Sequence, residues 1–320
     1  MMKKILFFEQ DSTFVKEDLK ILQKHFTVET IKFKTTILSM IWTIFAIARN
    51  DMVYIWFGNH HAAYSALVAK LLRKRVIIVA GGYDAASVPE LKYGFMQHPI
   101  KKYFAKLAFN SADIVLAVSL STMDNVEKYS NASNVKLVYL GVDPTTFKLD
   151  PKATRDTILT VCQASDWSRL VLKGVDKFIE VSKKLPQYNF MVIGVTDKAL
   201  NKLQSMAGPN VKFRPSMPRA ELEQYYNKAK IYCQLSRQDS FSLTTAEAML
   251  CGATPVITKN VGIGEVIFDH AEIVDYGDID ETVRIIEEVM SNKTPIQQKR
   301  DVILGLTPLK NREEALKDLI

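Results

Sequence analysis

The sequence contains few cysteines. Among its 320 residues only Cys162, Cys233 and Cys251 occur, and all three stand among apolar neighbours. No two of them have the spacing of zinc ligands, and nothing suggests the disulfide framework of a small secreted protein. The sequence therefore predicts buried, reduced thiols and a cytoplasmic protein.

Long hydrophobic runs are also missing. The apolar run Ile37–Ala48 is about twelve residues long, too short to span a bilayer, which takes about 20 residues. The apolar N-terminus is interrupted at Glu9, too early for a signal peptide. Two interpretations of Ile37–Ala48 stay open. We favour a helix buried against a sheet; the alternative is a helix that docks on the inner face of the membrane, with Lys32 and Lys34 before it.

Two further patterns are absent. The formal net charge of +7 is compatible with nucleic acid, anionic lipid or phosphorylated ligands. However, the basic residues form no stripe interleaved with aromatic residues, so we expect no nucleic-acid binding. No Gly-x-Gly-x-x-Gly follows the first strand of either half, which argues against a nicotinamide-dependent dehydrogenase.

The sequence does contain an alternation of short apolar strands and amphipathic helices, which is typical of parallel α/β layers. Two such series are joined by a polar segment with two prolines at residues 141–152. We expect an α/β fold with two Rossmann-like domains facing across a cleft, at residues 1–147 and 148–300. Residues 301–320 are expected to form a helix that packs back on the first domain. The expected strands are Lys4–Phe8, Thr27–Phe33, Met52–Trp56, Arg75–Val79, Ile114–Val118, Lys136–Tyr139, Thr157–Cys162, Asn189–Ile193, Val211–Phe213, Ile231–Leu235, Thr254–Thr258 and Glu272–Val274.

The most informative stretch runs from Asp239 to Ile257. Asp239 lies in a Ser-rich turn, and Glu247 stands eight residues later inside a helix that stops at Gly252. A loop that leads into a helix presents free backbone N–H groups and the positive end of the helix dipole, which together suit a phosphate. A carboxylate further along the helix can accept hydrogen bonds from a sugar diol. This arrangement favours a nucleotide-sugar ligand.

The same stretch resembles the Glu-x7-Glu signature of family-four retaining glycosyltransferases (glycosyl transferases group 1). That signature usually reads Glu-Gly-Phe-Gly-Leu, three variable residues, then Glu-Ala-Met-Ala-x-Gly-x-Pro-Val. Asp239 stands where the family has Glu, and Ser240 and Ser242 stand where it has Gly. Weaker similarities occur at Leu140–Asp143 and Val261–Ile267. The matching positions of the signature are Phe241, Leu243, Glu247, Ala248, Met249, Gly252, Pro255 and Val256.

This resemblance implies the GT-B fold, with a donor site in the second domain. Lys173, in a Lys-Gly pair, would be catalytic by holding the donor diphosphate together with an upstream arginine. Arg169 is the candidate for that arginine, although it also fits a solvated loop residue. Asp239 would face the donor sugar and Glu247 would hold the ribose hydroxyls. The remaining donor-binding positions would be Ser240, Phe241, Ser242 and Leu243.

The first domain contributes a second expected site. Gly82 and Asp84 follow an apolar strand, at a place where the family often has a His-Gly-x-Asp loop that faces the donor sugar and the acceptor. The resemblance implies that Gly82 contacts the donor and that Asp84 is catalytic; a plain Gly-Gly turn is the alternative. Asp278 and Asp280 imitate a metal-binding Asp-x-Asp, but they precede a helix and are better explained as capping residues. No metal site is predicted.

The function that follows is a retaining glycosyltransferase, with no cofactor apart from its nucleotide-diphosphate sugar donor. The acceptor would be a saccharide, a lipid-linked molecule or another hydroxyl compound, and the expected partners are this donor, this acceptor and, as an alternative, a membrane surface. Two other functions stay open: a nucleotide-sugar 2-epimerase of the same fold, and a non-catalytic glycosyltransferase-like binding subunit.

Overall fold

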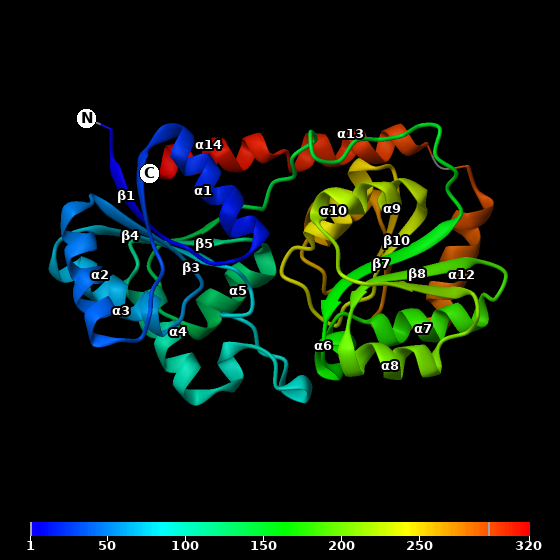
Figure 1. The fold of residues 1–320 in the computed structure, drawn as a ribbon, viewed down its shortest axis with the longest axis horizontal. Coiled ribbons are helices and arrows are strands. Elements are labelled where there is room, and N and C mark those ends of the chain that lie inside the picture. The colour runs from blue at the N-terminus through cyan, green and yellow to red at the C-terminus, as the bar shows by residue number, and fades with distance from the viewer. Residues whose placement is uncertain (1, 294) are drawn as a thin grey trace. The chain divides into compact units, whose positions relative to one another are not determined.

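The computed structural model describes residues 2–293 and 295–320, and these form two compact units. Unit 1 comprises Met1–Leu140 together with Lys310–Ile320, and unit 2 comprises Gly141–Leu309. Each unit is built on one six-stranded parallel sheet with helices on its faces (Figure 1). The predicted α/β fold with two Rossmann-like domains is therefore confirmed.

The sheet of unit 1 has the strand order β2-β1-β3-β4-β5-β6, and every neighbouring pair is parallel. Apart from Lys4 and Arg75, each the first residue of its strand, the central strands are buried because helices cover both faces. The strands are β1 (Lys4–Phe8), β2 (Thr27–Ile31), β3 (Met52–Trp56), β4 (Arg75–Ala80), β5 (Ile114–Ala117) and β6 (Val135–Leu137). The helices are α1 (Thr13–His25), α2 (Ile37–Arg49), α3 (His60–Leu71), α4 (Pro99–Ser111), α5 (Leu120–Tyr129) and α14 (Leu309–Leu319), with short 3-10 turns η1 (Pro89–Leu91) and η2 (Phe95–Gln97).

The helices of unit 1 lie on both faces of its sheet. Helices α2, α3 and α4 share one apolar core with the strand residues that point toward them. Four buried alanines of α3 (Ala62, Ala63, Ala66 and Ala69) let this helix pack closely there. Helices α1 and α14 lie on the opposite face (Figure 1), where Arg312 of α14 is bound to Asp18 of α1.

The sheet of unit 2 has the order β12-β11-β10-β7-β8-β9 and is also parallel throughout. Its strands are β7 (Thr157–Ala164), β8 (Asn189–Val195), β9 (Val211–Arg214), β10 (Ala229–Gln234), β11 (Thr254–Thr258) and β12 (Glu272–Val274). Its helices are α6 (Trp167–Leu172), α7 (Val175–Lys184), α8 (Asp197–Met206), α9 (Glu223–Lys228), α10 (Leu243–Leu250), α11 (Gly264–Ile267), α12 (Ile279–Ser291) and α13 (Ile296–Leu306), with 3-10 turns η3 (Arg219–Leu222) and η4 (Phe268–His270).

The chain leaves unit 1 after Leu140 and returns to it at Lys310. The sequence suggests instead a first boundary after residue 147 and a C-terminal helix from residue 301. In the structure the end of the chain forms two helices: α13 belongs to unit 2, whereas α14 belongs almost entirely to unit 1.

Three local predictions can be compared with the structure. The three cysteines are buried and unpaired, as predicted. Asp278 caps α12, as predicted, by accepting a hydrogen bond from the backbone N–H of Glu281. The favoured interpretation of Ile37–Ala48 as a buried helix is wrong: the segment is helical, but only Thr43, Ala46 and Ile47 of α2 are buried.

The cause is that both faces of α2 are apolar, so the hydrophobic pattern could not show which face is covered. Among the described residues, no helix is both long and apolar enough to cross a membrane.

Candidate functional site

The candidate site lies in unit 2, where β10 ends and the chain turns into α10. Ser242, the residue before the helix, has a left-handed backbone (φ 75°) and is buried. Its hydroxyl lies 2.8 Å from the hydroxyl of Thr245, and the carbonyl of Phe241 accepts a hydrogen bond from the N–H of Ile263 at 2.8 Å. These contacts hold the loop in one conformation, so the first backbone N–H groups of α10 have a defined position and direction. Such a helix N-terminus suits an anion.

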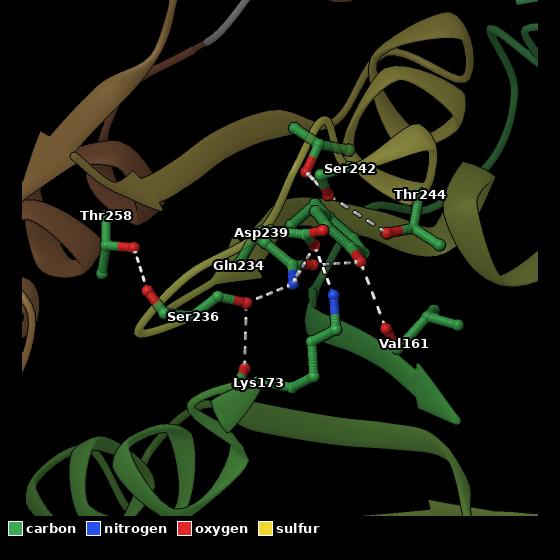
Figure 2. A network of polar contacts seen from close by, with 10 residues as sticks. Val161, Lys173, Gln234, Ser236, Asp239, Ser242, Thr244 and Thr258 are labelled. Carbon is green, nitrogen blue, oxygen red and sulfur yellow. Dashed lines mark hydrogen bonds and ion pairs between the residues drawn. The ribbon is translucent and has the colours of Figure 1, made fainter. Parts of the chain in front are cut away.

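An ion pair lies next to this loop. Lys173 Nζ donates to Asp239 Oδ2 at 2.6 Å, and Gln234 Nε2 donates to the same oxygen at 3.3 Å (Figure 2). The two charged side chains are only 18% and 13% exposed, so solvent screens them weakly. The backbone of Asp239 is itself held, because its N–H donates to the carbonyl of Asn260 at 3.0 Å. The carboxylate therefore fixes the lysine ammonium close to the α10 loop.

Gly174 explains why a glycine follows this lysine. Its φ is +67°, and a Cβ placed there would lie 1.7 Å from the carbonyl oxygen of Leu235. Only glycine allows this contact between the start of α7 and the residue that follows β10. The N–H of Arg237 also donates to the carbonyl of Leu172 at 2.8 Å. The backbone around Lys173 is thus packed directly against the loop that carries Asp239.

Arg169 lies on α6, four residues before Lys173, and its side chain is exposed. Residues four apart in a helix share a face, and Asp166 caps this helix by accepting from the N–H of Arg169 at 2.9 Å. Burial raises the pKa of the Cys162 thiol to about 11, while Lys173 and Arg169 both act in the opposite direction. Both cations therefore act electrostatically on Cys162, near the end of β7.

Glu247 occupies a different environment inside α10. It is 3% exposed; Arg219 Nε donates to Oε1 at 2.6 Å and the Tyr226 hydroxyl donates to Oε2 at 3.0 Å. Burial raises the pKa of this carboxyl, whereas Arg219 and Tyr226 act to lower it. The guanidinium of Arg219 also lies 5.1 Å from the ring centre of Phe147. The carboxylate is consequently held in one position, with a cation beside it.

The expected residues of the first domain lie in unit 1. Asp84 is fully buried: Oδ1 accepts from the N–H of Gly82 at 3.0 Å, and Oδ2 accepts from the N–H of Gly58 at 2.7 Å. Burial raises the pKa of Asp84 to about 6, against these backbone hydrogen bonds. Gly82 has φ 110°, so the turn requires a glycine there. In this geometry Asp84 ties the Gly82 turn to the end of β3.

The structure therefore brings Lys173, Asp239, Ser242 and Leu243 together around one loop of unit 2. Ser240 lies in that loop as well. Phe241 is 1% exposed and packs into the interior, so its ring is covered and does not face a ligand. Glu247 stands one turn further along α10.

Sequence reasoning missed several residues of the site. Gln234 and Ser236, which stand at and just after the end of β10, join Lys173 and Asp239 in one network (Figure 2). Their place at the carboxyl end of a parallel strand is the signal that could have identified them. Arg219 and Tyr226, the partners of Glu247, lie 28 and 21 residues before it, and no motif marks them.

This arrangement is suited to binding an anionic ligand. A lysine ammonium has three N–H donors, so Lys173 can hold Asp239 and a phosphate oxygen together. The helix N-terminus adds uncharged donors beside it. Among the described residues there is no group of three or more His, Cys, Asp or Glu side chains arranged to hold a metal ion.

Comparisons with known proteins show which family and which relatives the chain is similar to. Residues 158–303 match the family described as glycosyl transferases group 1. The chain is 26% identical over 260 residues to one component of the phosphatidylinositol N-acetylglucosaminyltransferase of Arabidopsis thaliana, covering 77% of this chain and 56% of that protein. It is 27% identical over 181 residues to D-inositol 3-phosphate glycosyltransferase of Thermobifida fusca, covering 47% of this chain and 42% of that protein. The chain thus spans about half the length of these curated relatives.

Solved structures share the whole fold. HepE from Anabaena, in complex with UDP and glucose, has a TM-score of 0.80 at 16% identity, covering 100% of this chain and 99% of that one. Sucrose-phosphate synthase from Thermosynechococcus elongatus has a TM-score of 0.80 at 14% identity, covering 99% and 98%. The predicted resemblance is confirmed: residues 158–303 match the model of the glycosyl transferases group 1, and the chain has the GT-B fold of those structures.

Proposed function

We propose that this chain is a retaining glycosyltransferase that moves a sugar from a nucleoside diphosphate donor to the hydroxyl of an acceptor. The observation that carries the proposal is the Lys173–Asp239 pair, 2.6 Å apart, beside the N-terminus of α10. A cation and free helix N–H groups at one place suit a diphosphate. Support also comes from HepE, a protein of the same fold whose structure holds UDP and glucose.

The donor diphosphate would bind between Lys173 and the first N–H groups of α10. As the bond between the anomeric carbon and the phosphate oxygen breaks, negative charge grows on the leaving diphosphate. A fixed cation and fixed N–H donors stabilise that charge more than the charge of the ground state. Arg169, one turn before Lys173 on α6, adds a second cation. This arrangement supplies the stabilisation that a metal ion provides in other enzymes, so we propose that the reaction needs no metal.

Glu247 would accept hydrogen bonds from the ribose hydroxyls of the donor. A carboxylate has about four lone-pair sites, so it can keep Arg219 and Tyr226 and still bind a diol. Arg219 compensates the charge of this buried group and keeps it ready to accept. The role of Arg219 is to position Glu247 and not to touch the reacting atoms.

Retention would follow from attack on the face that the diphosphate leaves. The acceptor oxygen forms the new bond to the anomeric carbon while the carbon–phosphate oxygen bond breaks, and the acceptor proton passes to the departing phosphate. Asp239 would face the donor sugar and hold Lys173 in place. The Asp239 side chain is one methylene shorter than the glutamate that is usual in the family. At this length its carboxylate contacts Lys173.

The acceptor is a hydroxyl compound, and we propose a polyol or a lipid-linked polyol. Two curated relatives support this choice, since one is named for phosphatidylinositol and the other for inositol 3-phosphate. Loops of unit 1, including the Gly82–Asp84 turn, are the proposed acceptor side.

Calorimetry with UDP, GDP and ADP tests the donor site directly. Lys173→Met removes one charge-assisted contact and should weaken binding of the preferred nucleotide about 10- to 100-fold. Lys183→Met, which removes the same charge from an exposed position of α7, is the matched control and should bind normally. Thermal melting establishes that both variants are folded. Equal affinity of the Lys173 variant and the control would remove the donor-site assignment.

Product analysis separates the three functions. A transferase releases a glycoside only when donor and acceptor are both present, and NMR of the anomeric proton shows whether the configuration is kept. A 2-epimerase changes the donor sugar without any acceptor. A non-catalytic binding protein shows nucleotide affinity but no turnover with any donor.

A further inference from the structure

The exposed face of α2 is the most unusual surface of unit 1. Six large apolar side chains of this helix are exposed, among them Ile37 (79%), Leu38 (65%), Trp42 (58%) and Phe45 (60%). They recur at helical spacing on the side opposite Thr43, Ala46 and Ile47, which pack inward. A soluble helix normally presents polar side chains on its outer face. The outer face of α2 is instead a continuous apolar stripe, which indicates a contact with another apolar phase.

The stripe belongs to a helix that is firmly held, so it is not a frayed segment. Thr36 caps the helix by accepting from the N–H of Ser39. The hydroxyl of Tyr64, from α3, donates to the carbonyl of Met40 at 3.0 Å, and Arg49 pairs with Glu29 on β2. The exposure of the stripe is therefore a property of the folded unit.

The three helices that carry and flank the stripe have charged residues of one sign. Helix α2 packs against α3, and α3 packs against α4; none of these three helices contains an Asp or Glu. They carry Lys70, Lys101, Lys102 and Lys106, and Lys34 precedes α2. Arg49 of α2 and Lys32 before it are paired with Glu29 and Glu9. Further apolar side chains are exposed on the same two neighbouring helices: Leu67 and Leu71 on α3, and Ile100 and Tyr103 on α4.

The net charge of the two units shows the same asymmetry. Unit 1 has 21 lysines and arginines against 14 aspartates and glutamates, which accounts for the whole formal net charge of +7, whereas unit 2 has 21 of each and is neutral. Donor binding is proposed for unit 2, which is neutral, so donor binding does not account for the positive charge of unit 1. Helices α3 and α4 contribute to this excess, because they carry lysines and no carboxylate.

We propose that α2 docks this protein on an anionic lipid bilayer, with its apolar stripe in the interface and the lysines of α3 and α4 against the headgroups. Trp42 and Phe45 are the side chains expected to enter deepest, since aromatic residues prefer the membrane interface. Apolar insertion and cation–headgroup attraction act together in such interfacial helices. This inference goes beyond the proposed function, because membrane docking can be measured without donor or turnover.

Co-sedimentation with vesicles tests it. The wild-type protein should bind vesicles of phosphatidylcholine and phosphatidylglycerol at low salt, and should bind pure phosphatidylcholine far less. A polar triple variant of the stripe should lower the partition coefficient by at least about tenfold. Phe268→Gln, which alters an equally exposed phenylalanine (69%) in unit 2, is the control. The triple variant is Ile41→Gln, Trp42→Gln, Phe45→Gln.

A second pair of variants tests the charge. Removing three cations from α3 and α4 should weaken binding on the order of a hundredfold, since each contributes about fivefold near an anionic surface. Removing three exposed lysines from unit 2 should have little effect. The test variant is Lys70→Gln, Lys101→Gln, Lys106→Gln; the control variant is Lys152→Gln, Lys212→Gln, Lys293→Gln.

Fluorescence of Trp42 gives a local readout. Trp56 is already buried and Trp167 lies on α6 of unit 2, so a blue shift on adding anionic vesicles should come from Trp42. The shift should disappear in Trp42→Phe, which still binds. Unchanged binding by the polar triple variant overturns the proposal. Equal binding to neutral and anionic vesicles also overturns it. So does concentration-dependent self-association in sedimentation velocity that the triple variant abolishes, because the stripe would then be an interface between copies of the chain.

Discussion

Arg312 should be the side chain that fastens the end of the chain to unit 1. Its guanidinium donates from Nε to Asp18 Oδ1 at 2.6 Å and from Nη2 to Oδ2 at 2.7 Å. The two side chains are 2% and 0% exposed. Tyr54 and Trp56 also donate to Asp18 Oδ2, at 2.7 and 3.0 Å. The pair therefore joins α14, α1 and β3 inside unit 1.

The expected loss of stability in Arg312→Met follows from the buried groups that lose their partner. Arg312→Met keeps the volume of the side chain but leaves the Asp18 carboxylate buried without its cation, which costs about 3–5 kcal/mol in comparable sites. Two hydrogen bonds from Arg312 to the carbonyls of Val138 and Tyr139 are lost as well. The hydrogen bonds from Tyr54 and Trp56 reduce the loss. We therefore expect the free energy of unfolding to fall by about 4 kcal/mol.

Urea denaturation followed by circular dichroism measures this loss. Asp18→Asn combined with Arg312→Met should be less destabilising than the sum of the two single changes, because the double variant contains no unpaired charge. Lys310→Met is the control: its ion pair with Glu314 is highly exposed and should contribute less than about 1 kcal/mol. A loss below about 1 kcal/mol for Arg312→Met would refute the reasoning.

Four further outcomes are expected. Gly174→Ala should lower stability by at least about 2 kcal/mol and weaken nucleotide binding, since its Cβ would lie 1.7 Å from the Leu235 carbonyl; Gly277→Ala, with a similar φ of +85° in open space, should cost less, and equal losses would contradict the argument. Because burial raises the pKa of Asp84 from 3.8 to about 6, its contribution to stability, on the order of 3 kcal/mol, is full below pH 3.8 and lost as the pH rises through 6. An NMR titration of its carboxyl carbon near 4 would disprove this. Glu247→Gln should weaken nucleotide binding about tenfold by removing a charged acceptor, which calorimetry measures against wild type. Activity should survive excess EDTA, and recovery of lost activity on adding manganese would rule that out.

The fold was predictable because its strands are short, apolar and separated by helical patterns. All twelve expected strands occur, and none differs from the structure by more than two residues at either end. Parallel strands buried on both faces leave continuous runs of Val, Ile and Leu that are easy to recognise. What the sequence could not supply is which helix returns to which unit, because α13 and α14 have similar patterns and differ only in long-range contacts such as Arg312–Asp18.

Those parts of the candidate site that lie within one short stretch of sequence were predictable. The loop before α10 and the Lys-Gly pair are local patterns, and the structure places Lys173 and Asp239 in contact although 66 residues separate them. The partners of Glu247 come from η3 and α9, segments without a motif. Arg219 pairs with Glu247 only because the fold brings the two residues together. A single sequence therefore gives no reason to prefer Arg219 over the other arginines as this partner.

The outer face of α2 shows why hydrophobic periodicity needs charge to be interpreted. An apolar run of this length fits a buried helix equally well, and periodicity alone gives that answer. The neighbouring helices carry the missing information, since a helix buried inside a protein has no need of flanking elements with lysines and without carboxylates. In α2, α3 and α4 the absence of acidic residues extends over all three helices, while unit 2 has balanced charges. Both features arise if unit 1 meets an anionic surface and unit 2 stays in water.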